Sequence, residues 1–219
     1  EKKKGFLEIY INIGIRTTLC AFFVVAGSED GPTLLLDGGC HGDETEGMIA
    51  IAKLMQLIDP KKLKGNLIGV PILNVQAFEL RQRTTIYWLP LCDMNRMWPG
   101  NPKGSVTHQI AYKYFNDIVQ KADYVLSAHG GGRYEWLTWR CIYGNQPEAL
   151  ELAKAMGGKW NVLQMPRTSA GPARGTMTGE CQELGIPHVT IECGGGGCSH
   201  PNILSMVVDS YIEGYQNVM

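Results

Sequence analysis

Three short apolar segments, each leading to a polar side chain, constrain the fold of this chain more than any other feature. Continuous apolar runs of this length are typical of strands buried in the middle of a sheet. In open α/β sheets, ligands bind just beyond the carboxyl ends of such strands. We therefore expect the polar residues after the runs to meet at one edge. The runs and their polar residues are 34–36 with His41, 124–126 with His129, and 189–191 with Glu192.

Segments with helical periodicity alternate with these strands. Apolar residues between 44 and 58 recur at the spacing of one helix face, and segments 107–122, 147–156 and 201–217 also read as helices, with Thr107 as an N-cap. Alternating strands and helices predict an α/β fold with a mostly parallel, mixed central sheet and helices on both faces. A chain of 219 residues with no composition break is expected to form one domain over 1–219.

The composition excludes several classes of partner. The formal net charge is -1 and the sequence pI is about 6.6, so neither nucleic acid nor an anionic membrane surface is expected to bind. No apolar run approaches the roughly 20 residues needed to span a bilayer. The seven cysteines form no Cys-x-x-Cys pair, and the first ten residues have no signal-peptide core, which favours reduced thiols and a cytoplasmic protein. A homo-oligomer is compatible with these properties.

The polar residues at the strand ends have the composition of a catalytic metal site. His41 and Glu44 form a His-x-x-Glu motif, and His129 is the best placed third ligand, with His200 as the alternative. Two histidines and one glutamate bind a single catalytic Zn²⁺ in known sites, and they also suit cobalt or manganese. A lone His-x-x-Glu pair is common by chance, and a histidine at a strand end is often only hydrogen-bonded. The convergence of three strand ends favours a metal site, with Glu192 as a base beside it.

Four motifs occur in the order known from one enzyme family. They are DGGCHGDETEG at 37–47, NVQAF at 74–78 with Arg83, DMNRMWPG at 93–100, and GIPHVTIECGG at 185–195. Together they resemble the succinylglutamate desuccinylase/aspartoacylase family, whose members are related to the zinc carboxypeptidases. The resemblance covers roughly residues 18–197. It implies a zinc carboxypeptidase-like fold and a zinc-dependent amidohydrolase.

The resemblance also implies roles for individual residues. His41, Glu44 and His129 would bind one Zn²⁺, and Glu192 would act first as general base and then as general acid. Arg83 would stabilise the oxyanion. A substrate carboxylate would be held by Asn95 and Arg96, with Arg174 as a weaker further contact. Asp93 would orient either Arg96 or a zinc ligand.

The chain departs from the family pattern in two places. Family members usually carry Asp-Leu-His at the third ligand, whereas this chain has Ser127-Ala128-His129, so the support of the metal from the neighbouring side chain is expected to differ. The members also continue into a C-terminal β-rich domain that this sequence does not contain. We therefore expect 1–219 to form a single catalytic α/β domain. The aromatic segment 133–139 would line a substrate pocket or belong to the core or an interface.

The predicted activity is removal of an acyl group from an N-acyl amino acid or a similar small amide that carries a carboxylate. Water activated by the metal would attack the carbonyl carbon with help from Glu192. Two alternatives remain open at this point. One is a carboxypeptidase-like metallopeptidase, which would use the same residues, and the other is a metal-binding regulator without activity.

Overall fold

The computed structural model describes residues 1–10, 17–85, 92–165, 173–196 and 201–219. In these residues the strands form one eight-stranded sheet in the order β1-β2-β4-β3-β5-β8-β6-β7. Their bounds are β1 Lys2–Tyr10, β2 Thr17–Ala26, β3 Glu29–Gly38, β4 Lys64–Val70, β5 Tyr124–His129, β6 Trp136–Tyr143, β7 Asn161–Gln164 and β8 His188–Gly195.

The helices are connected to the strands mostly by short loops. Their bounds are α1 Thr45–Leu57, α2 Val75–Glu79, α3 Val106–Asp117, α4 Pro147–Ala155, α5 Met177–Glu183 and α6 Pro201–Val218. Among the described residues, 3₁₀ turns lie at Pro60–Lys62, Met94–Arg96 and Val119–Lys121.

The middle of the sheet is parallel and its flanks are mixed. Strands β4, β3, β5 and β8 run parallel to one another. On one flank, β2 pairs antiparallel with β4 and β1 pairs antiparallel with β2. On the other, β6 is antiparallel to β8 while β7 is parallel to β6. The predicted mixed α/β sheet is thereby confirmed, because the apolar runs at 34–36, 124–126 and 189–191 lie in adjacent parallel strands.

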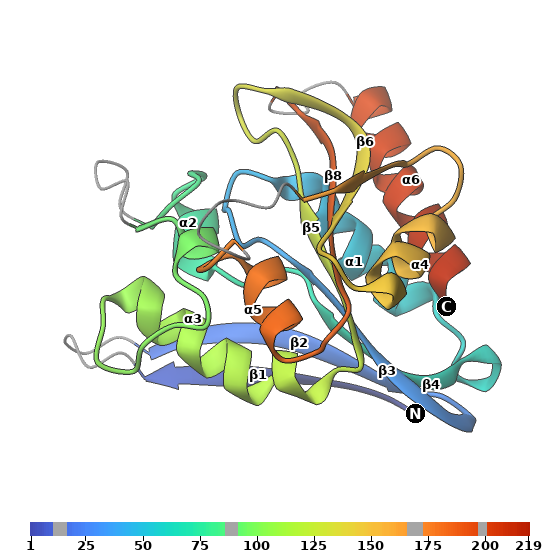
Figure 1. The fold of residues 1–219 in the computed structure, drawn as a ribbon, viewed down its shortest axis with the longest axis horizontal. Coiled ribbons are helices and arrows are strands. Elements are labelled where there is room, and N and C mark those ends of the chain that lie inside the picture. Colours follow the sequence, from blue (N-terminus) through green and yellow to red (C-terminus); the bar gives the residue numbers. More distant parts are fainter. Residues whose placement is uncertain (11–16, 86–91, 166–172, 197–200) are drawn as a thin grey trace.

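Helices cover both faces of the sheet, as the sequence predicted (Figure 1). One core packs α1, α4 and α6 against alternate strand residues such as Leu36, Leu126 and Ile191. The other packs α3 and α5 against the opposite set, which includes Leu35 and Val125. This alternation follows from the period of two along a strand. It also means that a polar residue in β5 or β8 is assigned to one face by its position alone.

Several short elements differ from the sequence-based expectation. The N-cap of α3 is Ser105, whose hydroxyl accepts from the His108 amide, so the helix begins before the predicted cap, Thr107. The segment 77–104 contains the end of α2 and the 3₁₀ turn Met94–Arg96, which are too short to show a period in the sequence. Strand β7 and helix α5 were not predicted, since elements of four and seven residues are too short to show a period.

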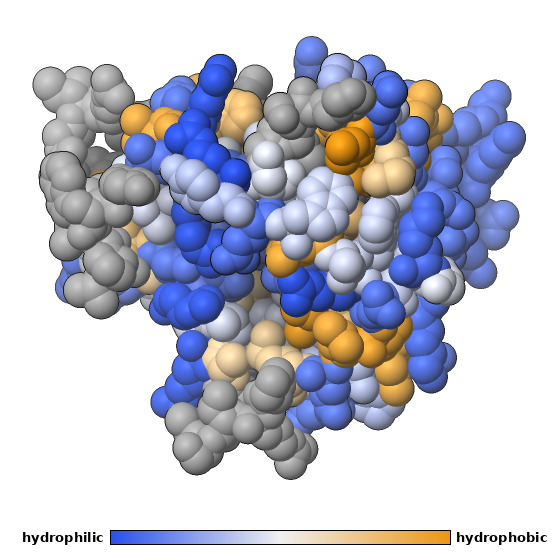
Figure 2. All heavy atoms as spheres, turned by 90° about the horizontal axis from the view of Figure 1, so that it is seen from above, coloured by the Kyte–Doolittle hydropathy of each residue, from blue (hydrophilic) through white to orange (hydrophobic). Residues whose placement is uncertain are grey.

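The surface carries hydrophobic side chains in separate groups among hydrophilic ones, as Figure 2 shows for one side. In the part of the chain that the structure describes, no helix is long and apolar enough to cross a membrane. The aromatic segment 133–139 divides between surface and core. Tyr134 is 79% exposed, whereas Trp139 packs partly buried against the α1, α4 and α6 core.

Candidate metal centre

The carboxyl ends of three central strands place the predicted site residues at one edge of the sheet. Gly38 at the end of β3 is opposite Ala128 in β5, and His129 at the end of β5 is opposite Glu192 in β8. Paired residues of neighbouring strands point to the same face. The His129 and Glu192 side chains therefore both project toward the face that α3 and α5 cover.

The link between β3 and α1 brings two more side chains to this edge. Gly39 has a φ of 71°, a left-handed conformation that glycine adopts without strain, and it turns the chain back over the end of the sheet. His41 follows in the turn, and Glu44 is the residue that caps α1. The two side chains are thus held by a tight turn and a helix start, which are both rigid features.

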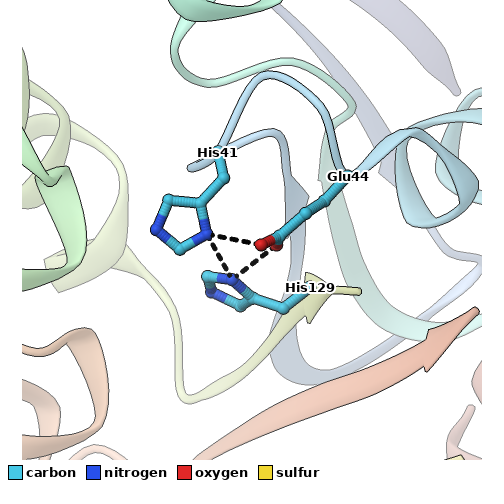
Figure 3. A group of neighbouring side chains, drawn as sticks. All are labelled: His41, Glu44 and His129. Atoms are coloured by element: carbon cyan, nitrogen blue, oxygen red, sulfur yellow. Dashed lines mark hydrogen bonds and ion pairs between the residues drawn. The ribbon is translucent and has the colours of Figure 1, made fainter. Parts of the chain in front are cut away.

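His41, Glu44 and His129 converge in a buried cluster (Figure 3). Glu44 Oε1 lies 2.8 Å from His41 Nδ1, and Glu44 Oε2 lies 2.9 Å from His129 Nδ1. The two Nδ1 atoms are 3.2 Å apart. All three side chains are no more than 5% exposed. Residues separated by 85 and 88 positions along the chain thus present their ligand atoms to one point.

The donor set fits a tetrahedral metal ion. Bonds of roughly 2.0–2.1 Å to nitrogen and oxygen place tetrahedral ligand atoms about 3.3 Å apart, close to the 3.2 Å between the two imidazole nitrogens. Neutral imidazole nitrogens and a carboxylate are also the donor types that a catalytic zinc ion takes. The roles of these three residues as metal ligands remain a prediction that this geometry supports.

The electrostatics of the cluster are those of strongly coupled opposite charges. Burial alone raises the pKa of Glu44, but His41 and His129 outweigh it and hold that pKa well below its usual value. Burial alone lowers the pKa of His41, while Glu44 and Asp93 raise it to about 9. Without a metal, the cluster thus attracts a proton into a place where a cation fits.

Asp93 connects the cluster to Arg83. Its Oδ1 lies 3.0 Å from His41 Nε2, which leaves Nδ1 of that ring free to face the other two ligands. Its Oδ2 accepts from Arg83 Nε and Nη2 at 3.2 and 3.1 Å. Arg83 Nη1 also donates to Glu44 Oε1 at 3.2 Å. Of the two roles predicted for Asp93, the structure places it against His41, and its salt bridge goes to Arg83.

Glu192 lies beside the cluster and is paired with a residue that the sequence did not single out. Arg140 in β6 is opposite Glu192 in the antiparallel register, and its Nε lies 3.2 Å from Glu192 Oε2. The Nε–H does not point at the carboxylate well enough for a hydrogen bond, so the contact is an ion pair. Arg140 could have been found only from the pairing of β6 with β8. The sequence shows no turn that joins these two strands directly, so it does not specify their register.

Three residues predicted to contact substrate lie on two neighbouring segments, around 95–96 and 174. Asn95 Oδ1 accepts from the Met177 amide at the start of α5, and Arg96 donates to the Asn95 carbonyl oxygen. Arg174 is exposed. Gly175 packs against the Arg96 backbone, so these segments are neighbours. None of Asn95, Arg96 and Arg174 is among the described residues that line the cleft, and their substrate-binding role remains a prediction.

An open cleft of about 930 Å³ adjoins the metal cluster. Its wall includes Glu44, Arg83 and Asp93 on one side and the loop after His129 on the other. Tyr134 lines it, which places one aromatic residue of segment 133–139 in a pocket. The remaining charged residues in its wall are Asp43, Arg81, Arg133 and Glu135.

The sequence and the fold both match one family of enzymes. Residues 30–211 match the catalytic domain of succinylglutamate desuccinylase/aspartoacylase. The chain belongs to the succinylglutamate desuccinylase/aspartoacylase family. The resemblance of the four motifs is thereby confirmed, and the cluster of His41, Glu44 and His129 lies within the matched residues.

Relatives of this family domain include a named deacetylase and several solved structures. The chain is 33% identical over 197 residues to N-alpha-acetyl-L-2,4-diaminobutyric acid deacetylase from Halomonas elongata, covering 85% of this chain and 55% of the relative. A succinylglutamate desuccinylase from Silicibacter sp. TM1040 superposes with a TM-score of 0.82 at 26% identity. This match covers 99% of this chain and 65% of that one. The family domain here thus spans between about half and two thirds of these relatives.

Two further structures show how far the fold extends. The product-bound ectoine utilization protein EutE (DoeB) from Ruegeria pomeroyi has a TM-score of 0.81 at 27% identity, over 99% of this chain and 66% of that one. Murein-tripeptide amidase MpaA from Escherichia coli O157 has a TM-score of 0.64 at 15% identity, over 92% and 87% of the two chains. The likeness to MpaA is one of fold alone and agrees with the predicted zinc carboxypeptidase-like architecture.

Proposed function

We propose that this family domain is a zinc-dependent deacylase that hydrolyses the amide bond of an N-acyl amino acid. The observation that carries the proposal is the convergence of two imidazole nitrogens and one carboxylate within a buried site beside an open cleft. The name of the Halomonas elongata relative, a deacetylase of an acylated diamino acid, supports the substrate class.

Each residue of the site has a part in this reaction. When bound, zinc lowers the pKa of water to about 7 and polarises a carbonyl oxygen. Glu192 takes a proton from the attacking water, whose oxygen forms a bond to the carbonyl carbon. Arg83 donates to the carbonyl oxygen as negative charge develops there. Glu192 then passes its proton to the nitrogen as the carbon–nitrogen bond breaks, which yields a carboxylic acid and an amine.

Contacts in the structure support these assignments. Glu192 projects from the same face as His129, in the paired position of the adjacent strand, which supports its proposed role as the base. Arg83 is about half exposed, lines the cleft and is anchored by Asp93 and Glu44. The cleft carries both arginines and acids, which suits a substrate with a carboxylate and, like the diamino acid of the relative, a second amino group.

The test is hydrolysis of a panel of N-acyl amino acids, including N-α-acetyl-2,4-diaminobutyric acid, by zinc-loaded protein. We expect release of free amine that a chelator abolishes and added zinc restores. The matched control is Glu192→Gln, which keeps the side-chain size and the ligands but removes the base. Activity that chelation leaves intact contradicts the mechanism. Cleavage of peptides in place of the panel would favour the metallopeptidase, and an inert zinc-loaded protein the regulator.

A further inference from the structure

A buried carboxylate lies under the metal centre without a cationic side chain to balance it. Asp37, near the end of β3, is 3% exposed. Among the residues that the structure describes, none of the ion pairs includes it. An ionised carboxylate in such a place is strongly disfavoured unless hydrogen bonds and a nearby positive charge compensate. Asp37 has hydrogen-bond donors around it, and its position indicates where a nearby positive charge would lie.

Two hydroxyl groups donate to this carboxylate. The Tyr114 hydroxyl lies 2.9 Å from Asp37 Oδ2. The Ser127 hydroxyl also hydrogen-bonds Asp37, which is its direct partner in the β3–β5 register. Burial raises the pKa of Asp37, whereas both hydroxyls and the neighbouring His129 lower it. Burial outweighs these groups and holds the pKa of Asp37 above its usual value, so the charged form still needs a further positive charge nearby.

The hydrogen bonds behind Ser127 continue in one direction. Because Ser127 donates to Asp37, its oxygen is free to accept from His188 Nε2, which lies 2.9 Å away. His188 Nδ1 then accepts from the Thr178 hydroxyl at 3.0 Å, and Thr178 in turn lies 3.2 Å from the Thr190 hydroxyl. Burial lowers the pKa of His188 to about 3, so the ring is neutral and its two nitrogens have these opposite roles. The whole chain of donors points at Asp37.

The charge lies next to a metal ligand. Ser127 precedes His129 by two residues in β5, so both side chains are on the same face, and Asp37 interacts electrostatically with His129. A cation bound by His129 would supply the positive charge that no ion pair of the described side chains provides to Asp37. The Asp-Leu-His pattern of the family has an acid at position 127, and in this chain the acid stands on the paired position of the neighbouring strand.

We propose that Asp37 is a positioning residue that strengthens metal binding from behind His129, taking over from β3 the carboxylate that position 127 lacks. The inference rests on the metal centre of the proposed function but not on its substrate. A simple hydrogen-bonding role in the core is the alternative. Only the positioning role requires the negative charge for metal affinity. Only that role allows the charge to be moved to position 127 with metal affinity retained.

The experiment measures zinc affinity by competition with a chromogenic chelator. Asp37→Asn keeps the size and removes the charge, and we expect zinc binding to weaken about 10- to 100-fold. Tyr114→Phe removes a hydrogen bond to the same carboxylate but keeps the charge, and we expect a change within about threefold. The double variant Asp37→Ser with Ser127→Asp moves the carboxylate to β5, and we expect affinity within about fivefold of the wild type.

The outcomes separate the two roles. Far-UV circular dichroism establishes that each variant is folded. Wild-type affinity in folded Asp37→Asn overturns the proposal, and so does a double variant that binds zinc no better than Asp37→Asn. If Asp37→Asn does not fold, the double variant decides alone: near-native affinity supports the proposal and a tenfold loss contradicts it. Because zinc binding is measured without substrate, absence of deacylase activity would leave this result standing.

Discussion

The two groups of predicted site residues behave differently in the fold. His41, Glu44 and His129 are buried and within hydrogen-bonding distance of one another. Arg96 and Arg174, predicted to hold the substrate carboxylate, are exposed and lie outside the cleft. Ligands on strand ends and a helix start are positioned by the backbone, whereas long side chains on loops are not. The comparison teaches that the backbone alone can bring the three predicted metal ligands together, whereas the substrate-binding roles of the arginines stay a prediction.

The largest effect is expected for Glu192, the proposed base beside the buried group. Glu192→Gln should lower kcat by about 10²- to 10⁴-fold, because a positioned general base contributes that much. Zinc content should stay at the wild-type level, since Glu192 is not one of the three clustered ligands. Steady-state kinetics and metal analysis on the same preparation check both. Loss of zinc together with activity would show that Glu192 belongs to the metal cluster.

The next prediction concerns Arg140, the ion-pair partner of the proposed base Glu192. Arg140→Gln removes the ion pair with Glu192 and should lower kcat about fivefold with little change in KM, as expected for a partly exposed pair worth roughly 1 kcal/mol. Arg140→Lys keeps the charge and should recover most of the loss. A change confined to KM would instead assign Arg140 to substrate binding.

Two exposed arginines, Arg133 and Arg96, test where the substrate carboxylate binds. Arg133 lines the cleft, and Arg96 does not. If the substrate carboxylate binds in this cleft, Arg133→Ala should raise KM about tenfold, the loss of one charge-assisted contact, and Arg96→Ala should change it less. KM values for one N-acyl amino acid in the two variants are the measurement. The reverse order would favour the family-based prediction for Arg96 and would mean that the cleft closes differently around substrate.

The smallest effect concerns stability below neutral pH. His188 is held neutral by burial, with a pKa of about 3 against a usual value near 6.5, so between these values only the unfolded chain takes up its proton. Wild-type stability should therefore fall as pH drops, by up to about 1.4 kcal/mol per pH unit from this residue.

His188→Gln removes that proton uptake. The variant should be less stable than the wild type at pH 7, where it loses packing and hydrogen bonds, and the gap should narrow toward pH 4.5. Urea unfolding at several pH values measures it, and the remaining carboxylates are common to both proteins. A stability difference that stays constant with pH would show that His188 takes up its proton equally in the folded and the unfolded chain.

The sequence predicted much of the fold, and the reasons are visible in particular elements. The apolar runs ending at His41 and His129 required burial on both faces, which only the central parallel strands provide. Helix α1 was predictable because its apolar face has a clear period. Strand β7 and helix α5 were not, since their short lengths show no period and their places depend on β6 and β8.

In the site, the types of the predicted ligand residues could be inferred from the sequence more readily than the residues with which the site residues pair. The ligand types and their strand-end positions pointed to His41, Glu44 and His129 together. The partners Arg140 and Asp37 required the strand order and register, because each acts across a strand pairing that joins residues about 50 to 90 positions apart. The burial of His188 and its hydrogen bond to Ser127 likewise depend on the pairing of β5 with β8. The alternative ligand His200 lies outside the described residues.

The central claim is that two imidazoles and one carboxylate bind a single zinc ion. X-ray absorption spectroscopy of the zinc-loaded protein tests it most directly, with His129→Ala as the control. We predict one zinc per chain in a shell of nitrogen and oxygen atoms at roughly 2.0–2.1 Å, with a signal from two imidazoles that falls to one in the variant. A sulfur-rich shell, or a spectrum that His129→Ala leaves unchanged, would contradict the account.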